Sequence, residues 1–231
     1  MNIIIQARMN SKRLPGKVLL KVKDITILDY IIYRLSFSKY KNIIIIATST
    51  KKSDDPIHNY CIKNNIKCFR GDLNNVTERY MELIKHYKFN SFLRICADSP
   101  MIDHRIVDKA ITLYNSDNYD LITNKFPRSF PIGQTVEILR SKKFLKSIYL
   151  IKSNAEKENV TEHYYNNHKY FNIKNFKDKE NHSLISLAID TKKNFLDFKK
   201  FLINSKYNMN NIPYKSIIKI YGSKFSKIVN E

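Results

Sequence analysis

Four cationic side chains, Arg8, Lys12, Arg13 and Lys17, lie within ten residues just after the apolar run 3–5. Such a run is typical of a buried parallel strand, and a Pro-Gly pair near the last lysine is a turn signal. Guanidinium forks bind oxyanions bidentately, and the backbone N–H groups of such a loop can point inward, so the pattern predicts a phosphate-binding loop. The alternative is a basic surface loop. The GxxxxGK[ST] spacing of a P-loop is absent.

A carboxylate is the second candidate for chemistry. Asp98 follows the apolar segment 92–96 in the stretch ADSP, where a parallel strand would end. Mg²⁺ is typically held by one or two protein carboxylates together with substrate phosphates. The alternative role of a helix cap fits Asp103 better, because Asp103 stands just before a periodic apolar run.

These groups need a scaffold that brings strand ends together, and the first half of the chain alternates strand and helix patterns. Strand patterns occupy 3–5, 43–46, 67–69, 92–96 and 119–123; helical patterns or starts occupy 25–35, 53–56, 75–87 and 103–114. Repeated units of this length predict an α/β fold with a doubly wound, mostly parallel, Rossmann-like sheet.

The second half has a different pattern, with more irregular segments. We expect a crossing at 126–133, strands at 134–139, 170–176 and 184–189, helices at 141–151 and 155–168, and a polar stretch at 208–211.

Composition limits the class of protein. A chain of 231 residues can bury one substantial core, so we expect a single domain over 1–231. The net charge is +20, but the lysines are spread among many Asn and Ile residues, so we do not expect a nucleic-acid partner. The chain shows no apolar run of 18 residues and no signal-peptide pattern, and its three cysteines form no CxxC pair. These features predict a cytoplasmic protein that does not enter a membrane.

The segment QARMNSKRLPGK resembles QARMGSTRLPGK, the N-terminal signature of the cytidylyltransferases that include spore-coat polysaccharide biosynthesis protein F. More distantly it resembles the loop of the synthetases for CMP-3-deoxy-manno-octulosonate and CMP-neuraminate. The resemblance implies a nucleotide-diphospho-sugar transferase type of fold and a nucleotidyl transfer from CTP. It also implies nucleotide binding by the loop residues Gln6, Ala7, Arg8, Asn10, Ser11, Arg13 and Lys17.

Further segments carry the same resemblance. ATST is identical to the end of the family's second strand, which places Thr48 and Ser49 at the nucleotide base, and FRGDLNNVTERY adds Arg70 and Arg79 to the nucleotide-binding set. RICADSPMID resembles RITGDCPLID and places Asp98 on a metal-binding aspartate. Asp190 resembles the second metal aspartate of a VDT pattern, although the usual acidic residues do not follow it.

Two segments imply an acceptor site. RSFPIGQTVEI resembles RTYPDGLDVEV, which suggests acceptor binding by Arg128, Gly133, Gln134 and Glu137, with Thr135 in place of an aspartate. EKENVTEHY resembles EREHVTPYI, with an asparagine in place of a histidine. The resemblance suggests that residues 125–185 form an excursion for acceptor binding and for homodimerisation.

The resulting hypothesis is a Mg²⁺-dependent cytidylyltransferase that moves CMP from CTP to an anionic sugar or sugar-like acceptor and releases pyrophosphate. Arg13, Lys17 and Asp98 are the expected catalytic residues, and Asp98 and Asp190 the expected metal ligands. One alternative is an NDP-sugar pyrophosphorylase acting on a sugar 1-phosphate. Another, from a different class, is a non-catalytic nucleotide- or RNA-binding protein.

Overall fold

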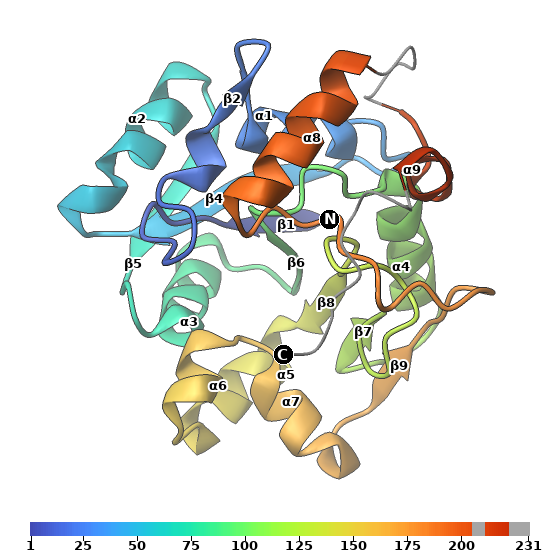
Figure 1. Cartoon of the computed structure of the whole chain (residues 1–231). Helices are drawn as coiled ribbons and strands as arrows, with labels where there is room; N and C mark the ends of the chain where they lie inside the picture. Colours follow the sequence, from blue (N-terminus) through green and yellow to red (C-terminus); the bar gives the residue numbers. More distant parts are fainter. Residues whose placement is uncertain (205–210, 222–231) are drawn as a thin grey trace.

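A seven-stranded sheet forms the centre of the fold, which the computed structural model describes over residues 1–204 and 211–221 (Figure 1). Its order is β5-β4-β1-β6-β8-β7-β9; β8 runs antiparallel to its two neighbours, and every other adjacent pair is parallel. The strands are β1 (Asn2–Gln6), β4 (Ile43–Ser49), β5 (Lys67–Gly71), β6 (Ser91–Cys96), β7 (Leu121–Thr123), β8 (Glu137–Arg140) and β9 (Ile173–Asn175). The predicted mostly parallel α/β sheet is confirmed.

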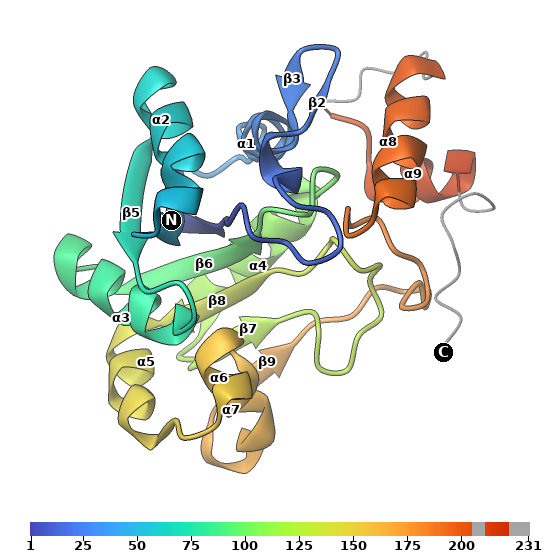
Figure 2. The ribbon, with the colours of Figure 1, turned by 60° about the vertical axis from the view of Figure 1, so that its left-hand side comes forward.

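Helices cover both faces of this sheet (Figure 2). One face carries α1 (Ile27–Leu35), α2 (Asp55–Lys63), α4 (His104–Ser116), α8 (Lys192–Asn204) and α9 (Tyr214–Tyr221). The other carries α3 (Val76–Tyr87), α5 (Ser141–Ser147), α6 (Asn154–Glu158) and α7 (Glu162–Asn166). A two-stranded hairpin, β2 (Lys21–Val22) and β3 (Ile25–Thr26), precedes α1. Within the described residues, no helix is both long and apolar enough to cross a bilayer.

The apolar run of β1 follows from its central place in the sheet. Ile3 pairs with Ile44 on one side and with Leu93 on the other. Ile3 and Ile5 are buried under one helical layer and Ile4 under the other, so the strand has no polar face. The carboxyl ends of β1, β4 and β6 therefore meet at one edge of the sheet, where the loop 8–17 begins.

Two helix starts show how carboxylates are used. The Asp103 carboxylate accepts a hydrogen bond from the backbone N–H of Arg105 at 3.0 Å, which confirms it as the cap of α4. Helix α2 begins at Asp55, inside the helix start predicted at 53–56, and no side chain caps it. The carboxylate of Asp54 instead accepts from the backbone N–H of Met9 at 2.7 Å, across the sheet edge.

The second half departs from the predicted pattern in three places. The helix predicted at 155–168 is two short helices, because extended backbone at Asn159 ends α6 and Thr161 turns inward to donate to Glu137. The strand predicted at 184–189 is wrong: only an isolated bridge between Ile132 and Ser186 forms there. The predicted strand at 134–139 begins only at Glu137, because the residues before it are occupied by tertiary contacts.

The patterns above predict no element after residue 189, yet α8 and α9 complete one helical layer. Phe198 of α8 packs edge-on against Tyr30 of α1, with ring centroids 5.3 Å apart. The predicted polar stretch at 208–211 falls almost entirely outside the described residues.

Candidate active site

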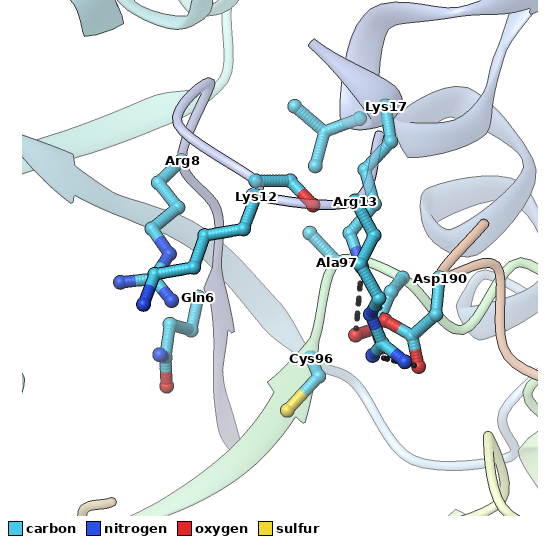
Figure 3. Close-up of a pocket in the computed structure, with 11 residues that line it drawn as sticks. Gln6, Arg8, Lys12, Arg13, Lys17, Cys96, Ala97 and Asp190 are labelled. Carbon is cyan, nitrogen blue, oxygen red and sulfur yellow. Dashed lines mark hydrogen bonds and ion pairs between the residues drawn. The ribbon is translucent and has the colours of Figure 1, made fainter. Parts of the chain in front are cut away.

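A cavity of about 300 Å³ lies at the carboxyl ends of β1 and β6, beside the loop 8–17 (Figure 3). It brings together residues that the sequence places up to 184 positions apart. It is lined by Gln6, Arg8, Ser11, Lys12, Arg13, Lys17, Val18, Cys96, Ala97, Asp98 and Asp190. The predicted phosphate loop and both predicted metal ligands therefore face the same space.

The loop keeps its shape through backbone hydrogen bonds. The carbonyl oxygen of Met9 accepts from the N–H groups of Ser11 at 2.9 Å and Gly16 at 2.8 Å. Gly16 has a φ of +69°, a left-handed conformation that glycine adopts without strain. The buried carboxylate of Asp54 holds the N–H of Met9 and so ties the root of the loop to the end of β4.

Two carboxylates share one ammonium group in the cavity. Lys17 Nζ lies 3.2 Å from Asp98 Oδ2 and 2.8 Å from Asp190 Oδ1. Arg13 reaches Asp190 from the solvent side, with Nη2 3.3 Å from Oδ2. The Lys17 side chain is 11% exposed, whereas those of Asp98 and Asp190 are 27% and 32% exposed. The carboxylates therefore remain accessible to a ligand in the cavity.

The donor set fits a magnesium ion that is shared with a substrate. Within the described residues, no three His, Cys, Asp or Glu side chains are arranged to hold a metal by themselves. Asp98 and Asp190 supply two carboxylates next to open space, which is the protein contribution that Mg²⁺ commonly uses beside phosphate oxygens.

Other loop residues contact neighbouring elements. Arg8 Nη2 lies 2.8 Å from Glu158 Oε1 at the end of α6, and the Asn10 amide donates to the Ser53 hydroxyl at 3.3 Å. Lys12 lines the cavity and forms no ion pair with the described residues. Arg8 and Lys12 thus supply positive charge at the side of the cavity away from Lys17 (Figure 3).

Three of the predicted nucleotide-binding side chains are buried and do not line the cavity. Ala7 is 1% exposed, and Thr48 and Ser49 are fully buried. The Ser49 hydroxyl donates to Asp54, while the Thr48 hydroxyl has no hydrogen-bond partner within the described residues. A nucleotide contact at these three positions stays a prediction.

Both predicted arginines lie outside the cavity lining. Arg70 donates to the Ser49 carbonyl oxygen at 2.8 Å and forms an ion pair with Asp55 at 2.7 Å. Arg79 is fully buried and donates to three carbonyl oxygens, including that of Asp72 at 2.8 Å. Both arginines therefore bind backbone carbonyl oxygens near the end of β4 and stabilise the chain there. A contact between either of them and a nucleotide stays a prediction.

Glu137 is fully buried in a hydrogen-bond network. Its carboxylate accepts from Arg94 at 2.5 Å, from the Thr161 hydroxyl at 2.8 Å and from the Tyr165 hydroxyl at 2.5 Å. Burial by itself raises the pKa of Glu137, but attraction to Arg94 and Lys125, with the two hydroxyl hydrogen bonds, outweighs burial and holds that pKa below its ordinary value. Glu137 is therefore a charged interior group.

The other predicted acceptor residues shape the crossing segment. Gln134 is fully buried, and its amide bonds the backbone of Asp103 and Met101. Gly133 has a φ of +91°, and a Cβ there would lie 2.8 Å from the backbone nitrogen of Ala188, so only glycine fits without strain. Arg128 donates to the Thr135 hydroxyl at 3.1 Å, and burial lowers the pKa of its guanidinium. None of these residues lines the cavity.

Sequence reasoning missed several contributors to the site. The sequence pattern places Asp54 at a helix start and gives no role to Glu158 or Arg94. Their contacts could not be predicted, because their partners lie far away in the sequence. Cys96 lines the cavity, and burial raises the pKa of its thiol, so it is a neutral group there. The only available signal was that Arg94 interrupts an otherwise apolar strand.

A mostly parallel α/β sheet whose strand ends carry a cation-rich loop beside two carboxylates is an arrangement suited to binding the phosphates of a nucleotide together with a metal ion. The family model for cytidylyltransferases matches residues 2–226, so the chain belongs to the cytidylyltransferase family. It is accordingly a nucleotidyltransferase, and the predicted family membership is confirmed.

Two individual relatives each match more than half of the chain. The chain is 32% identical over 218 residues to an uncharacterised protein of Methanocaldococcus jannaschii, covering 93% of this chain and 87% of that protein. It is 33% identical over 144 residues to spore coat polysaccharide biosynthesis protein SpsF of Bacillus subtilis, covering 60% and 58%.

A solved structure of a cytidylyltransferase from Leptospira borgpetersenii superimposes with a TM-score of 0.89 at 30% identity, covering 100% of this chain and 97% of that one. A CMP:2-keto-3-deoxy-manno-octonic acid synthetase in complex with CTP superimposes with a TM-score of 0.66 at 16% identity, covering 87% and 97%, which shows a shared fold.

Proposed function

We propose that this protein transfers the CMP moiety of CTP to an anionic sugar or sugar-like acceptor in a Mg²⁺-dependent reaction that releases pyrophosphate. The observation that carries the proposal is the cluster of Lys17, Arg13, Asp98 and Asp190 at one side of a single cavity. Cations and carboxylates at one site suit a substrate that brings both negative phosphates and a metal ion. The names of the two relatives above, a spore coat polysaccharide biosynthesis protein and a synthetase complexed with CTP, point to the same chemistry.

In the transfer, an oxygen of the acceptor attacks the α-phosphorus in line, a new P–O bond forms, and the bond to the β-phosphate oxygen breaks. Pyrophosphate leaves, and the acceptor proton passes to solvent. Such reactions depend chiefly on positioning and on stabilising charge. Arg13 and Lys17 would bind the β- and γ-phosphates and stabilise the leaving pyrophosphate. Asp98 and Asp190 would hold Mg²⁺, which would supply positive charge for the phosphates and favour ionisation of the acceptor hydroxyl.

Charge near the crossing segment supports an anionic acceptor. Among the described residues, Lys125 and Arg128 form no ion pair with a carboxylate, whereas Arg8, Arg13 and Lys17 all do. Arg128 is attracted to the buried Glu137 carboxylate, but that carboxylate is already in a direct ion pair with Arg94. Glu137 is thus one carboxylate among three cations, Arg94, Lys125 and Arg128, and a sugar carboxylate, phosphate or phosphonate would supply further negative charge.

The test is pyrophosphate release from CTP and Mg²⁺ in the presence of neutral sugars, sugar acids and sugar phosphates. We expect release with an anionic acceptor, and a comparison of CTP with UTP, ATP and GTP should favour CTP. Equal or greater release with a neutral acceptor would contradict the anionic acceptor, and a preference for another nucleotide would favour an NDP-sugar pyrophosphorylase.

We also propose that the chain forms a homodimer through the excursion 125–185. Tyr149, Leu150 and Tyr170 are 78%, 62% and 80% exposed there, and Leu150 and Tyr170 line the same surface hollow. Exposed apolar side chains that gather in one patch mark interaction surfaces. Sedimentation should give twice the chain mass, and a Leu150→Lys, Tyr170→Lys variant should sediment as a monomer. A monomeric wild type would contradict this proposal.

A further inference from the structure

Arg94 contacts Gln6, a residue of the cavity lining, without lining the cavity itself. It projects from β6, and its side chain is 11% exposed. Its Nε and Nη2 donate to Gln6 Oε1 at 3.3 and 3.2 Å, and its Nη1 donates to Glu137 Oε2 at 2.5 Å. One guanidinium therefore connects a cavity-lining residue of β1 with the interior network of β8.

These contacts determine which way the Gln6 amide points. A guanidinium carries hydrogen-bond donors and no acceptor, so only the amide oxygen of Gln6 can face Arg94. The flipped amide would place its NH₂ group against two N–H donors. Nε2 must therefore point away from Arg94, and it makes no hydrogen bond to any described residue. Since Gln6 lines the cavity, this unpaired donor is available to a ligand there.

The guanidinium itself is held firmly. Burial acts to lower the pKa of Arg94, but attraction to the Glu137 carboxylate, which also accepts its hydrogen bond, raises it more strongly, so Arg94 stays charged. Glu137 neutralises this charge and is itself fixed by Thr161 and Tyr165. The pair therefore adds no net charge to the cavity, while the guanidinium polarises the Gln6 amide and strengthens its N–H groups as donors.

Gln6 and Arg8 lie on the opposite side of the cavity from Lys17 and Asp190 (Figure 3). If the phosphates bind near Lys17, as the proposed function requires, Gln6 faces the nucleoside part of CTP. We infer that Arg94 is a positioning residue that orients Gln6 so that Nε2 donates to an oxygen of the nucleoside, either a ribose hydroxyl or a pyrimidine carbonyl. This inference rests on the proposed binding of CTP.

The test measures binding of CTP and of inorganic tripolyphosphate by calorimetry, and uses the ratio of the two affinities. Tripolyphosphate lacks a nucleoside, so the ratio isolates the nucleoside contact from general charge effects. Gln6→Met removes the donor without adding charge, and we expect this ratio to fall about tenfold, the effect of one hydrogen bond. Arg94→Lys keeps the charge beside Glu137 but loses the two-donor grip on Gln6, and we expect a fall of about threefold to tenfold.

Two further variants keep the test decisive. Gln6→Glu retains an acceptor for Arg94, so it should fold even if Gln6→Met does not, and its affinity ratio should still fall about tenfold because the donor is gone. Arg140→Lys is the matched control: Arg140 lies on β8 and donates to the Tyr119 carbonyl oxygen, outside the cavity. Its affinity ratio should equal that of the wild type.

If the ratio of affinities stays unchanged in the Gln6 variants and in Arg94→Lys, the inference is overturned. This includes the case in which a variant loses affinity for CTP and for tripolyphosphate by the same factor. Binding needs no acceptor and no turnover, so the outcome is separable from the proposed function. Lower ratios together with absent pyrophosphate release would contradict only the proposed transfer. Unchanged ratios in an active enzyme would contradict only the role of Arg94, and a wild type that does not bind CTP would contradict both.

Discussion

Beside the loop 8–17, the carboxylates of Asp98 and Asp190 are partly exposed and face an open cavity. Next to the crossing segment, by contrast, Gln134 and Glu137 are fully buried. The loop groups form ion pairs that a ligand can reach and rearrange. Glu137 already has three hydrogen-bond partners, and Gln134 bonds backbone groups on both sides. Both regions match family motifs in the sequence.

The comparison teaches that a polar residue within a family motif can either be available to a substrate or stabilise the fold. The degree of burial of its side chain distinguishes these two roles. Partly exposed charges can exchange protein partners for phosphates or a metal at modest cost. A buried ion pair cannot, because removing one partner leaves an uncompensated charge in the interior. Variants in the two regions should therefore affect different measurements.

The largest expected effect is that of Asp98→Asn, which keeps the shape of the side chain and removes its charge. If Asp98 acts on the substrate and its metal, pyrophosphate release should fall by about 10³-fold or more while thermal stability stays close to that of the wild type. Asp24→Asn in the β2–β3 turn is the control, since Asn tolerates its φ of +61°. Near wild-type turnover at saturating Mg²⁺ would remove Asp98 from the mechanism.

In the crossing segment, Glu137→Ala should mainly reduce stability. It leaves the Arg94 guanidinium buried without its carboxylate, and we expect the free energy of unfolding to fall by about 3–5 kcal/mol in denaturant titrations. Glu180→Ala removes a carboxylate that is 67% exposed and should change this free energy by less than about 0.5 kcal/mol. If the two variants lower the free energy of unfolding equally, the buried Glu137 carboxylate contributes no more to stability than an exposed one.

Returning to the loop, Lys17→Ala should lower kcat by about 10²- to 10³-fold, which is typical for removal of one donor to a developing anion. Lys17→Arg should recover only part of this loss, because a planar guanidinium cannot occupy the same point between two carboxylates. Steady-state kinetics with CTP provide the measurement, and exposed Lys142→Ala is the control. Unchanged kcat and KM in Lys17→Ala would show that the loop does not bind the triphosphate.

Arg128→Ala tests whether any residue of the crossing segment acts on substrate. Its guanidinium forms no direct ion pair with a carboxylate among the described residues, so we expect the KM of an anionic acceptor to rise about tenfold. The KM of CTP should stay unchanged, and a neutral acceptor should show no such increase. If no acceptor is affected, the crossing segment has only a structural role.

The smallest effect concerns pH. The pKa of Glu137 is depressed in the folded state, so its stabilisation is fully present above the unfolded pKa of about 4.3 and is lost as the pH falls through the lower folded pKa. The stability difference between wild type and Glu137→Gln should therefore be constant near neutral pH and shrink in acid. Denaturant titrations between pH 3 and 7 would measure it. A difference that grows on acidification would show that Glu137 is not held as the anion.

Much of the fold could be predicted because its signals are local. The apolar run of β1, the periodic helices and the cap at Asp103 follow from neighbouring residues, and all are confirmed. Three other features could not be predicted from neighbouring residues. They are the antiparallel direction of β8, the division of residues 155–168 into two helices and the absence of a strand at 184–189. They depend on which backbone groups find partners elsewhere, as when Thr161 turns toward Glu137.

For the site, the sequence by itself determined that a cation-rich loop follows β1, and it singled out Asp98 and Asp190 through short motifs. Only the tertiary structure decided which polar groups face the cavity. Lys17 meets Asp98 and Asp190 across 81 and 173 residues, and Arg94 meets Gln6 across 88. Periodicity reports whether a side chain is buried but not what it is buried against. That choice depends on strand order and register, through which the packing of the whole sheet selects each partner.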